Sequence, residues 1–125
     1  MKIPWGFSFL IVLLVSMVFS TGAVLAGERA EDNYRAYCVQ CHGRNGDGRG
    51  LNIRDMSVQP RDHTDARSMS SRSDEELFKA IKEGGQAVSK SVLMPPWKGT
   101  FTDEEIKELV KYLRTLCKCE HGSAS

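Results

Sequence analysis

The chain has 125 residues, and its 17 basic and 16 acidic side chains give a formal net charge of +1. This near balance implies no basic face, so nucleic acid is excluded as an expected partner. Four cysteines, an even number, first suggest two disulfides if the protein is exported.

Residues 1–26 have the pattern of an export signal. Lys2 is followed by an apolar, uncharged stretch over 5–19, and small residues then continue to Ala26. These are the charged start, apolar segment and cleavage site of a signal peptide, so we predict cleavage after Ala26. The alternative is an uncleaved membrane anchor, because a spanning helix needs only ~20 residues.

The remainder, residues 27–125, is predicted to form one domain with a tail at about 117–125. Its first helix is expected over about 30–41, where aromatic residues and cysteines recur at helical spacing. Apolar residues are sparse between 43 and 73, where Arg, Asp, Ser and Gly dominate. Because so long a polar loop is unusual in a small domain, a large buried group is expected to hold it in place.

The sequence Cys-Val-Gln-Cys-His at 38–42 is the C-x-x-C-H signature of covalent haem attachment. At this spacing the thiols of Cys38 and Cys41 reach the two vinyl groups of a porphyrin and form thioethers, and His42 is then held under the iron as the proximal ligand. A structural zinc site normally needs four ligands. A thioredoxin-like pair needs a preceding strand, whereas a helical pattern precedes this motif. The motif therefore predicts one covalent haem c with its iron.

Two more helices are predicted from their start signals. Ser73 and Thr102 are each followed by acidic residues, with a Glu three positions later that completes a capping box. The second helix is expected to stop at Gly84 and Gly85 and to turn Leu77, Phe78 and Ile81 inward. The third presents an apolar stripe to the core, formed by Ile106, Leu109, Val110, Leu113 and Leu116. The predicted fold class is all-α, with three main helices and long loops.

A haem of this type takes a sixth ligand, and methionine is common in electron carriers. Met94 precedes two prolines, which force an extended strap and reduce the entropy lost when the sulfur is fixed at a metal. We therefore predict Met94 as the distal ligand, with Met56 filling a gap in the core and Met69 in an exposed loop. His63 and His121 are further possible iron ligands, but their positions in a polar loop and a tail predict that both are exposed.

With these motifs the sequence resembles the class I cytochromes c, and most of all the bacterial monohaem branch found as free periplasmic carriers and as domains of oxidases and reductases. The matching segments are Cys38–Gly43, Gly46–Gly48, Pro60–Asp62, Met94–Trp97 and the helix that begins at Thr102.

The resemblance implies a small cytochrome c fold wrapped round one covalent haem. It implies Cys38 and Cys41 as thioether positions, and His42 and Met94 as the iron ligands. It further suggests that the carbonyl of Pro60 accepts a hydrogen bond from the proximal histidine, which would fix the orientation of that ring.

The resemblance also implies that the first and last helices cross, with Tyr34 or Tyr37 against Leu109 or Tyr112. Two further residues have expected roles as well. Arg61 is a candidate partner for a haem propionate, because guanidinium groups match carboxylates, with a solvated loop arginine as the alternative. Trp97 is expected to fill the core rather than bind a propionate.

Cys117 and Cys119 lack the spacing of a second haem site. Residues two apart on a helix point roughly 200° away from each other, but past a helix end the two thiols can close a small disulfide. A disulfide is the expectation for an exported pair; a bridge to another chain and a soft metal are the alternatives.

The predicted function is a monohaem c-type cytochrome that carries single electrons between periplasmic or membrane redox partners, a reductase and an oxidase, as a monomer. The sequence contains no recognisable general base, nucleophile or substrate site, so no enzymatic activity of its own is expected. The alternatives are a haem-based sensor of small ligands, in which Met94 leaves the iron, and a tethered cytochrome subunit of a membrane oxidoreductase complex. The expected location is periplasmic or otherwise exported, with membrane attachment only if residues 1–26 stay uncleaved.

Overall fold

The structure, a computed structural model, describes residues 21–54 and 56–122. Most of the predicted export signal therefore lies outside the described residues. The described part is helical and contains no strand, which confirms the all-α prediction. Its elements are α2 (Thr21–Tyr37), α3 (Val39–His42), η1 (Leu51–Ile53), α4 (Ala66–Ser70), α5 (Asp74–Glu83), η2 (Gly85–Val88) and α6 (Asp103–Cys117). Within it, no helix combines the length and the apolar character needed to cross a membrane.

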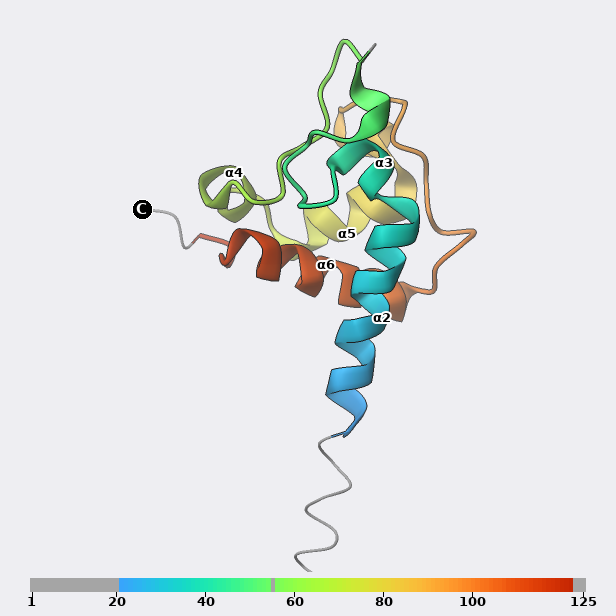
Figure 1. The fold of residues 1–125 in the computed structure, drawn as a ribbon, viewed down its shortest axis with the longest axis vertical. Helices are drawn as coiled ribbons and strands as arrows, with labels where there is room; N and C mark the ends of the chain where they lie inside the picture. Colours follow the sequence, from blue (N-terminus) through green and yellow to red (C-terminus); the bar gives the residue numbers. More distant parts are fainter. Residues whose placement is uncertain (1–20, 55, 123–125) are drawn as a thin grey trace, which may run out of the picture.

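The first predicted helix is two helices in the structure. α2 ends at Tyr37, Cys38 follows as a turn residue with φ −107° and ψ −31°, and α3 adds one more turn. α2 lies across α6 in Figure 1, and the rings of Tyr34 and Tyr112 meet there with centroids 5.3 Å apart. Of the aromatic contacts expected between the first and last helices, this is the one that forms. Tyr37 instead contacts the ring of Trp97, which packs against the core as predicted.

Both predicted capping boxes are present. At the start of α5, the Ser73 hydroxyl accepts the Glu76 amide at 3.2 Å, and the Ser73 amide donates to the Glu76 carboxylate at 2.9 Å. Thr102 and Glu105 form the same pair at the start of α6, at 3.2 and 2.8 Å. Such a cap is worth about 1 kcal/mol. α5 ends at Glu83 and Gly84 caps it, so the helix stops where the sequence predicts.

The core lies between α6 and the helices packed on it. Of the residues of α5 and α6 predicted to turn inward, six are buried: Leu77, Ile81, Ile106, Leu109, Val110 and Leu113. The other two, Phe78 and Leu116, are half-buried and pack against this core. The prediction that Met69 lies in an exposed loop is wrong, because its side chain is fully buried in this core. The Asp65 carboxylate accepts the Ser68 amide at 3.2 Å and so caps the short helix α4, which carries Met69.

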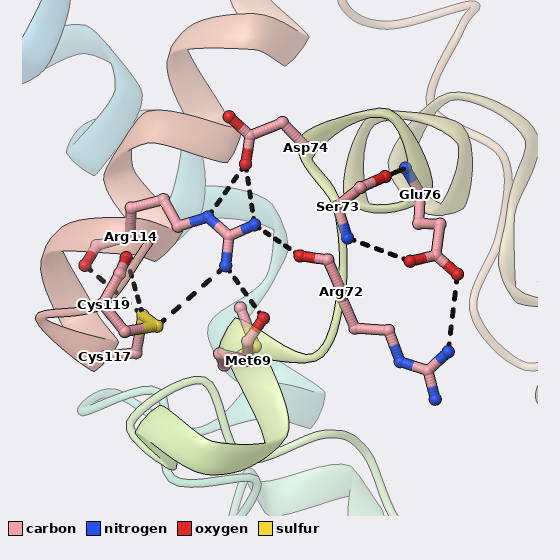
Figure 2. Close-up of polar contacts among 8 residues, drawn as sticks. All are labelled: Met69, Arg72, Ser73, Asp74, Glu76, Arg114, Cys117 and Cys119. Atoms are coloured by element: carbon pink, nitrogen blue, oxygen red, sulfur yellow. Dashed lines mark hydrogen bonds and ion pairs between the residues drawn. A yellow bond between two sulfur atoms is a disulfide. The ribbon is translucent and has the colours of Figure 1, made fainter. Parts of the chain in front are cut away.

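A buried arginine fastens α6 to the segment before α5 (Figure 2). The Arg114 guanidinium donates to the Asp74 carboxylate at 2.9 and 2.7 Å, to the Met69 carbonyl at 2.8 Å and to the Arg72 carbonyl at 2.6 Å. One side chain thus bonds a carbonyl of α4, a carbonyl of the α4–α5 connection and the carboxylate at the start of α5, so the ends of three helices are held together.

A disulfide closes the end of α6. The helix stops at Cys117, Lys118 takes a left-handed conformation with φ 52°, and Cys117 is then bonded to Cys119. The expected disulfide is confirmed, and it joins these two cysteines within the chain. Beyond it, the Gly122 amide donates to the Ser70 carbonyl at 2.8 Å, so the tail lies along α4.

Candidate haem-binding site

A cleft of about 710 Å³ opens between α3, the segment 56–68 and the segment 85–97. Its volume lies within the range of roughly 300–1,000 Å³ found for small-molecule and cofactor sites. The predicted site residues all line it: Cys38, Cys41, His42 and Met94. Residues that lie far apart in the sequence are therefore gathered around one space.

The two cysteines of the motif lie on a single helical turn. The Cys38 carbonyl accepts the amides of Cys41 at 3.2 Å and His42 at 2.9 Å. Side chains three apart on such a turn share a face, so both thiols belong to the same wall of the cleft. Both are free and half-buried. Burial, with a smaller contribution from Cys41, raises the pKa of the Cys38 thiol to about 12.

The glycine-rich loop after the motif closes back onto this turn. Gly48 and Gly50 donate their amides to the carbonyls of His42 and Cys41, at 2.8 and 3.0 Å. These bonds satisfy acceptors that a helix end leaves open. A Cβ atom at position 50 would collide with the Gln40 carbonyl oxygen, so only glycine allows the approach.

The His42 ring is oriented by a backbone carbonyl. Its Nδ1 lies 3.0 Å from the Arg61 carbonyl oxygen and donates to it, which leaves Nε2 for a ligand. The suggestion that Pro60 supplies this acceptor is wrong by one residue. The Pro60 carbonyl instead faces Gly48, where a Cβ atom would approach it to 2.8 Å. Burial lowers the pKa of His42, although the bond to Arg61 acts in the opposite direction, and the neutral ring is the form that binds metals.

The prediction from the sequence is wrong for His63. It was expected to be exposed, but its side chain is 7 % exposed and stacks on His42, with ring centroids 4.2 Å apart and planes 19° apart. Its Nδ1 is hydrogen-bonded to the Tyr34 hydroxyl at 2.9 Å. Burial and the neighbouring His42 and Arg61 lower the pKa of His63 well below 6.5. His121, by contrast, is exposed as predicted.

The strap that carries Met94 is fastened to the end of α5. The Gly85 amide donates to the Met94 carbonyl at 3.0 Å, and the Trp97 amide donates to the Ile81 carbonyl at 3.0 Å. Gly84 has φ +84°, and a Cβ atom there would lie 2.9 Å from the Met94 carbonyl oxygen. The Met94 side chain is half-buried and packs against the core.

Met56 also lines the cleft. It is half-buried in its wall and is not among the residues packed in the core. The prediction that it fills a gap in the core is therefore wrong.

Two arginines in the cleft wall, Arg61 and Arg72, bear on whether a haem fits this cleft. Among the described residues, the buried Nε of Arg72 has no hydrogen-bond partner. Arg61 donates to the Ser68 hydroxyl, and burial together with the nearby Arg72 guanidinium lowers the pKa of Arg61. An apolar cleft with adjacent cations in its wall, one of them incompletely bonded, fits a flat apolar group with carboxylates, as haem is.

Residues 26–113 match the family model described as cytochrome c oxidase, cbb3-type, subunit III. The chain is a class I c-type cytochrome of this family. Covalently bound haem c is what defines c-type cytochromes, so the match and the cleft agree on the cofactor. No curated protein sequence matches this cytochrome significantly.

Several solved structures resemble this cytochrome, two of which are informative. One is the KustC0563 c-type cytochrome, with 29% sequence identity and a TM-score of 0.55, matched over 70% of this chain and 95% of that one. The other is a chain of the Kuenenia stuttgartiensis reducing HAO-like protein complex Kustc0457/Kustc0458, with 25% identity and a TM-score of 0.57. That match covers 78% of this chain but only 48% of the other, so this cytochrome spans about half of its length.

Proposed function

We propose that residues 27–125 form a monohaem electron carrier, exported by the segment 1–26. Cys38 and Cys41 hold one haem through thioethers, and His42 and Met94 are its iron ligands. The observation that supports this most strongly is that all four side chains line one apolar cleft, although Met94 comes from a distant part of the chain.

The bound haem supplies a one-electron couple at its iron. Two covalent attachments keep the group in place in either oxidation state. The Arg61 carbonyl orients His42 and increases the basicity of its ring. The two prolines after Met94 stiffen the strap, and the hydrogen bond from Gly85 fixes where that strap begins.

The cleft walls influence the reduction potential of the haem and bind its propionates. Most of the cleft lining is apolar, and burial of a haem among such side chains is one of the protein's means of setting its potential. Arg61 and Arg72 are positioned to receive the propionates, which would satisfy the free Nε of Arg72.

This proposal is tested by expressing residues 1–125 and measuring the mass and the visible spectrum of the purified protein. We expect the mass of residues 27–125 plus one haem, with a low-spin spectrum and a thioether-to-iron charge-transfer band in the oxidised form. The reduced protein should not bind carbon monoxide rapidly, since Met94 occupies the sixth position. Rapid binding would favour the small-ligand sensor, and a colourless protein would refute the proposal altogether.

A second candidate is a cytochrome subunit of a larger oxidoreductase assembly. Two observations favour it: the family model is named for a subunit of an oxidase, and one structural neighbour belongs to an HAO-like complex. Native mass measured on protein from its source, with and without detergent, separates the two. A single chain that begins at Gly27 supports the free carrier, whereas co-purification with a catalytic subunit or retention of residues 1–26 supports the assembly.

A further inference from the structure

The two buried histidines of the cleft form one stacked unit. The rings of His42 and His63 lie nearly parallel at 4.2 Å. Two aromatic or imidazole rings at this distance are in van der Waals contact over their faces. Rotation of the His42 ring out of its plane would therefore collide with His63.

His63 is itself fixed from two sides. Its ring is hydrogen-bonded to the Tyr34 hydroxyl at 2.9 Å, and its backbone amide donates to the Gly46 carbonyl at 2.6 Å. Tyr34 is 2 % exposed and is held in turn against Tyr112 of α6. The face that His63 presents to His42 is therefore anchored, through Tyr34, in the junction of α2 and α6.

One short segment restrains His42 in two directions. The Arg61 carbonyl accepts from Nδ1 in the plane of the ring, and His63, two residues later, covers the ring face. A single hydrogen bond allows an imidazole to swing about that bond. A hydrogen bond combined with a stacked neighbour selects one plane.

We propose that His63 is a positioning residue that sets the plane of the His42 imidazole relative to the haem. This inference rests on the proposed role of His42 as an iron ligand. The plane of an axial imidazole determines how the unpaired electron of ferric iron is distributed among its orbitals. His63, together with Tyr34, thus fixes the electronic structure of the centre without touching the iron.

The test uses the ferric holoprotein and its His63→Ala, His63→Phe and Tyr34→Phe variants. Low-temperature electron paramagnetic resonance reports the axial geometry, and paramagnetic proton NMR of the haem methyl groups reports the ligand plane. His121→Ala, in the exposed tail, is the matched control. Circular dichroism checks that each variant keeps its helices.

With His63→Ala we expect a shifted and broadened low-field resonance and a changed order or spread of the haem methyl shifts, with the iron still low-spin. His63→Phe restores the ring face and should return the spectra close to those of the unmodified protein. Tyr34→Phe removes only the anchor and should give a smaller shift in the same direction as His63→Ala.

Unchanged spectra in His63→Ala would overturn the proposal, and so would a high-spin iron in both His63 variants, which would make His63 a ligand itself. If His63→Ala does not accumulate, Tyr34→Phe decides, and an unchanged spectrum there overturns the anchoring by Tyr34 on which the proposal depends. Failure of the proposed function is separately visible, because the unmodified protein would then lack a low-spin haem spectrum before any variant is made.

Discussion

The two halves of this small domain are held by different means. α5 and α6 begin with capping boxes, carry regular apolar stripes and pack directly on each other. The segment 43–63 contributes hardly any buried apolar side chain, and backbone hydrogen bonds from its glycines hold it against α3. One half has its own side-chain core, and the other forms a wall of the cleft.

The two halves therefore differ in the source of the free energy that stabilises them. The free energy of burial in the α5–α6 half comes from the residues themselves, at roughly 25 cal/mol per Å² of apolar surface. The cleft wall gains comparable burial only when an apolar group occupies the cleft. The contrast predicts that haem stabilises the two halves unequally.

The largest effect is expected from the loss of Cys38 and Cys41. Changing both Cys38 and Cys41 to Ser should abolish covalent haem, because both thioether positions are lost, while either single change leaves at most one thioether. Denaturing gels stained for haem peroxidase activity, together with intact mass, measure this. The matched control changes Cys117 and Cys119 to Ser, which removes the disulfide at the end of α6 but should leave haem attached.

Hydrogen exchange in the haem-free Cys38→Ser, Cys41→Ser variant compares the stability of the two halves directly. Amides in 43–63 should lose their protection almost completely, whereas those in α6 should keep part of theirs, since that helix retains α5 and its cap. Mass spectrometry of peptic fragments resolves the two regions. Equal loss in both would show that haem organises the whole domain and that the two halves are not distinct.

Met94→Ala should retain covalent haem but lose the thioether band, and its reduction potential should fall by on the order of 100 mV, a modest part of the ~0.8 V that axial ligands span. Visible spectroscopy and a redox titration measure both. Met56→Ala is the matched control, because Met56 lines the same cleft and is not a proposed ligand. A wild-type spectrum for Met94→Ala would assign the sixth position to another residue.

Arg114→Ala should lower the free energy of unfolding of the holoprotein by about 2–3 kcal/mol, because charged hydrogen bonds are lost and two backbone carbonyls are left without their donor. Urea denaturation followed by circular dichroism measures it. Arg35→Ala is the control: its partner Glu31 is a neighbour on the same exposed helix face, and such pairs contribute about 0.3–0.5 kcal/mol. Similar losses for the two variants would contradict the role of Arg114 as a fastener.

The smallest effect concerns the caps. Ser73→Ala and Thr102→Ala should each cost about 1 kcal/mol, because each removes the acceptor for an amide in the first turn. Thr100→Ala, an exposed residue just before α6, should stay within about 0.5 kcal/mol of the unmodified protein. A cost at Thr100 equal to that at Thr102 would mean that the capping bond is not the cause.

The halves also differ in how far the sequence predicts them. The starts of α5 and α6 follow from Ser73 and Thr102, because a cap is a local device whose parts lie within four residues. The turn that carries Cys38, Cys41 and His42 is local for the same reason. All-α architecture and the crossing of the first and last helices were likewise predicted.

The features that were missed depend on residues meeting from distant parts of the chain. His63 looks like a solvated loop residue until Tyr34 supplies a partner from α2. The burial of Met69 requires the short helix α4, whose only local signal is Asp65. Arg114 is one of many arginines in the sequence, and its role appears only where α6 passes the carbonyl groups of 69 and 72.

The hydrogen bond between Gly85 and Met94 has a consequence for how this cytochrome can diversify. It joins the two residues that flank the loop 86–93. Surface loops closed in this way tolerate changes in length. Insertions or replacements there would remodel the rim, where Val92 and Leu93 are exposed, and give a docking protein a different surface to meet. The sulfur of Met94 would stay where it is.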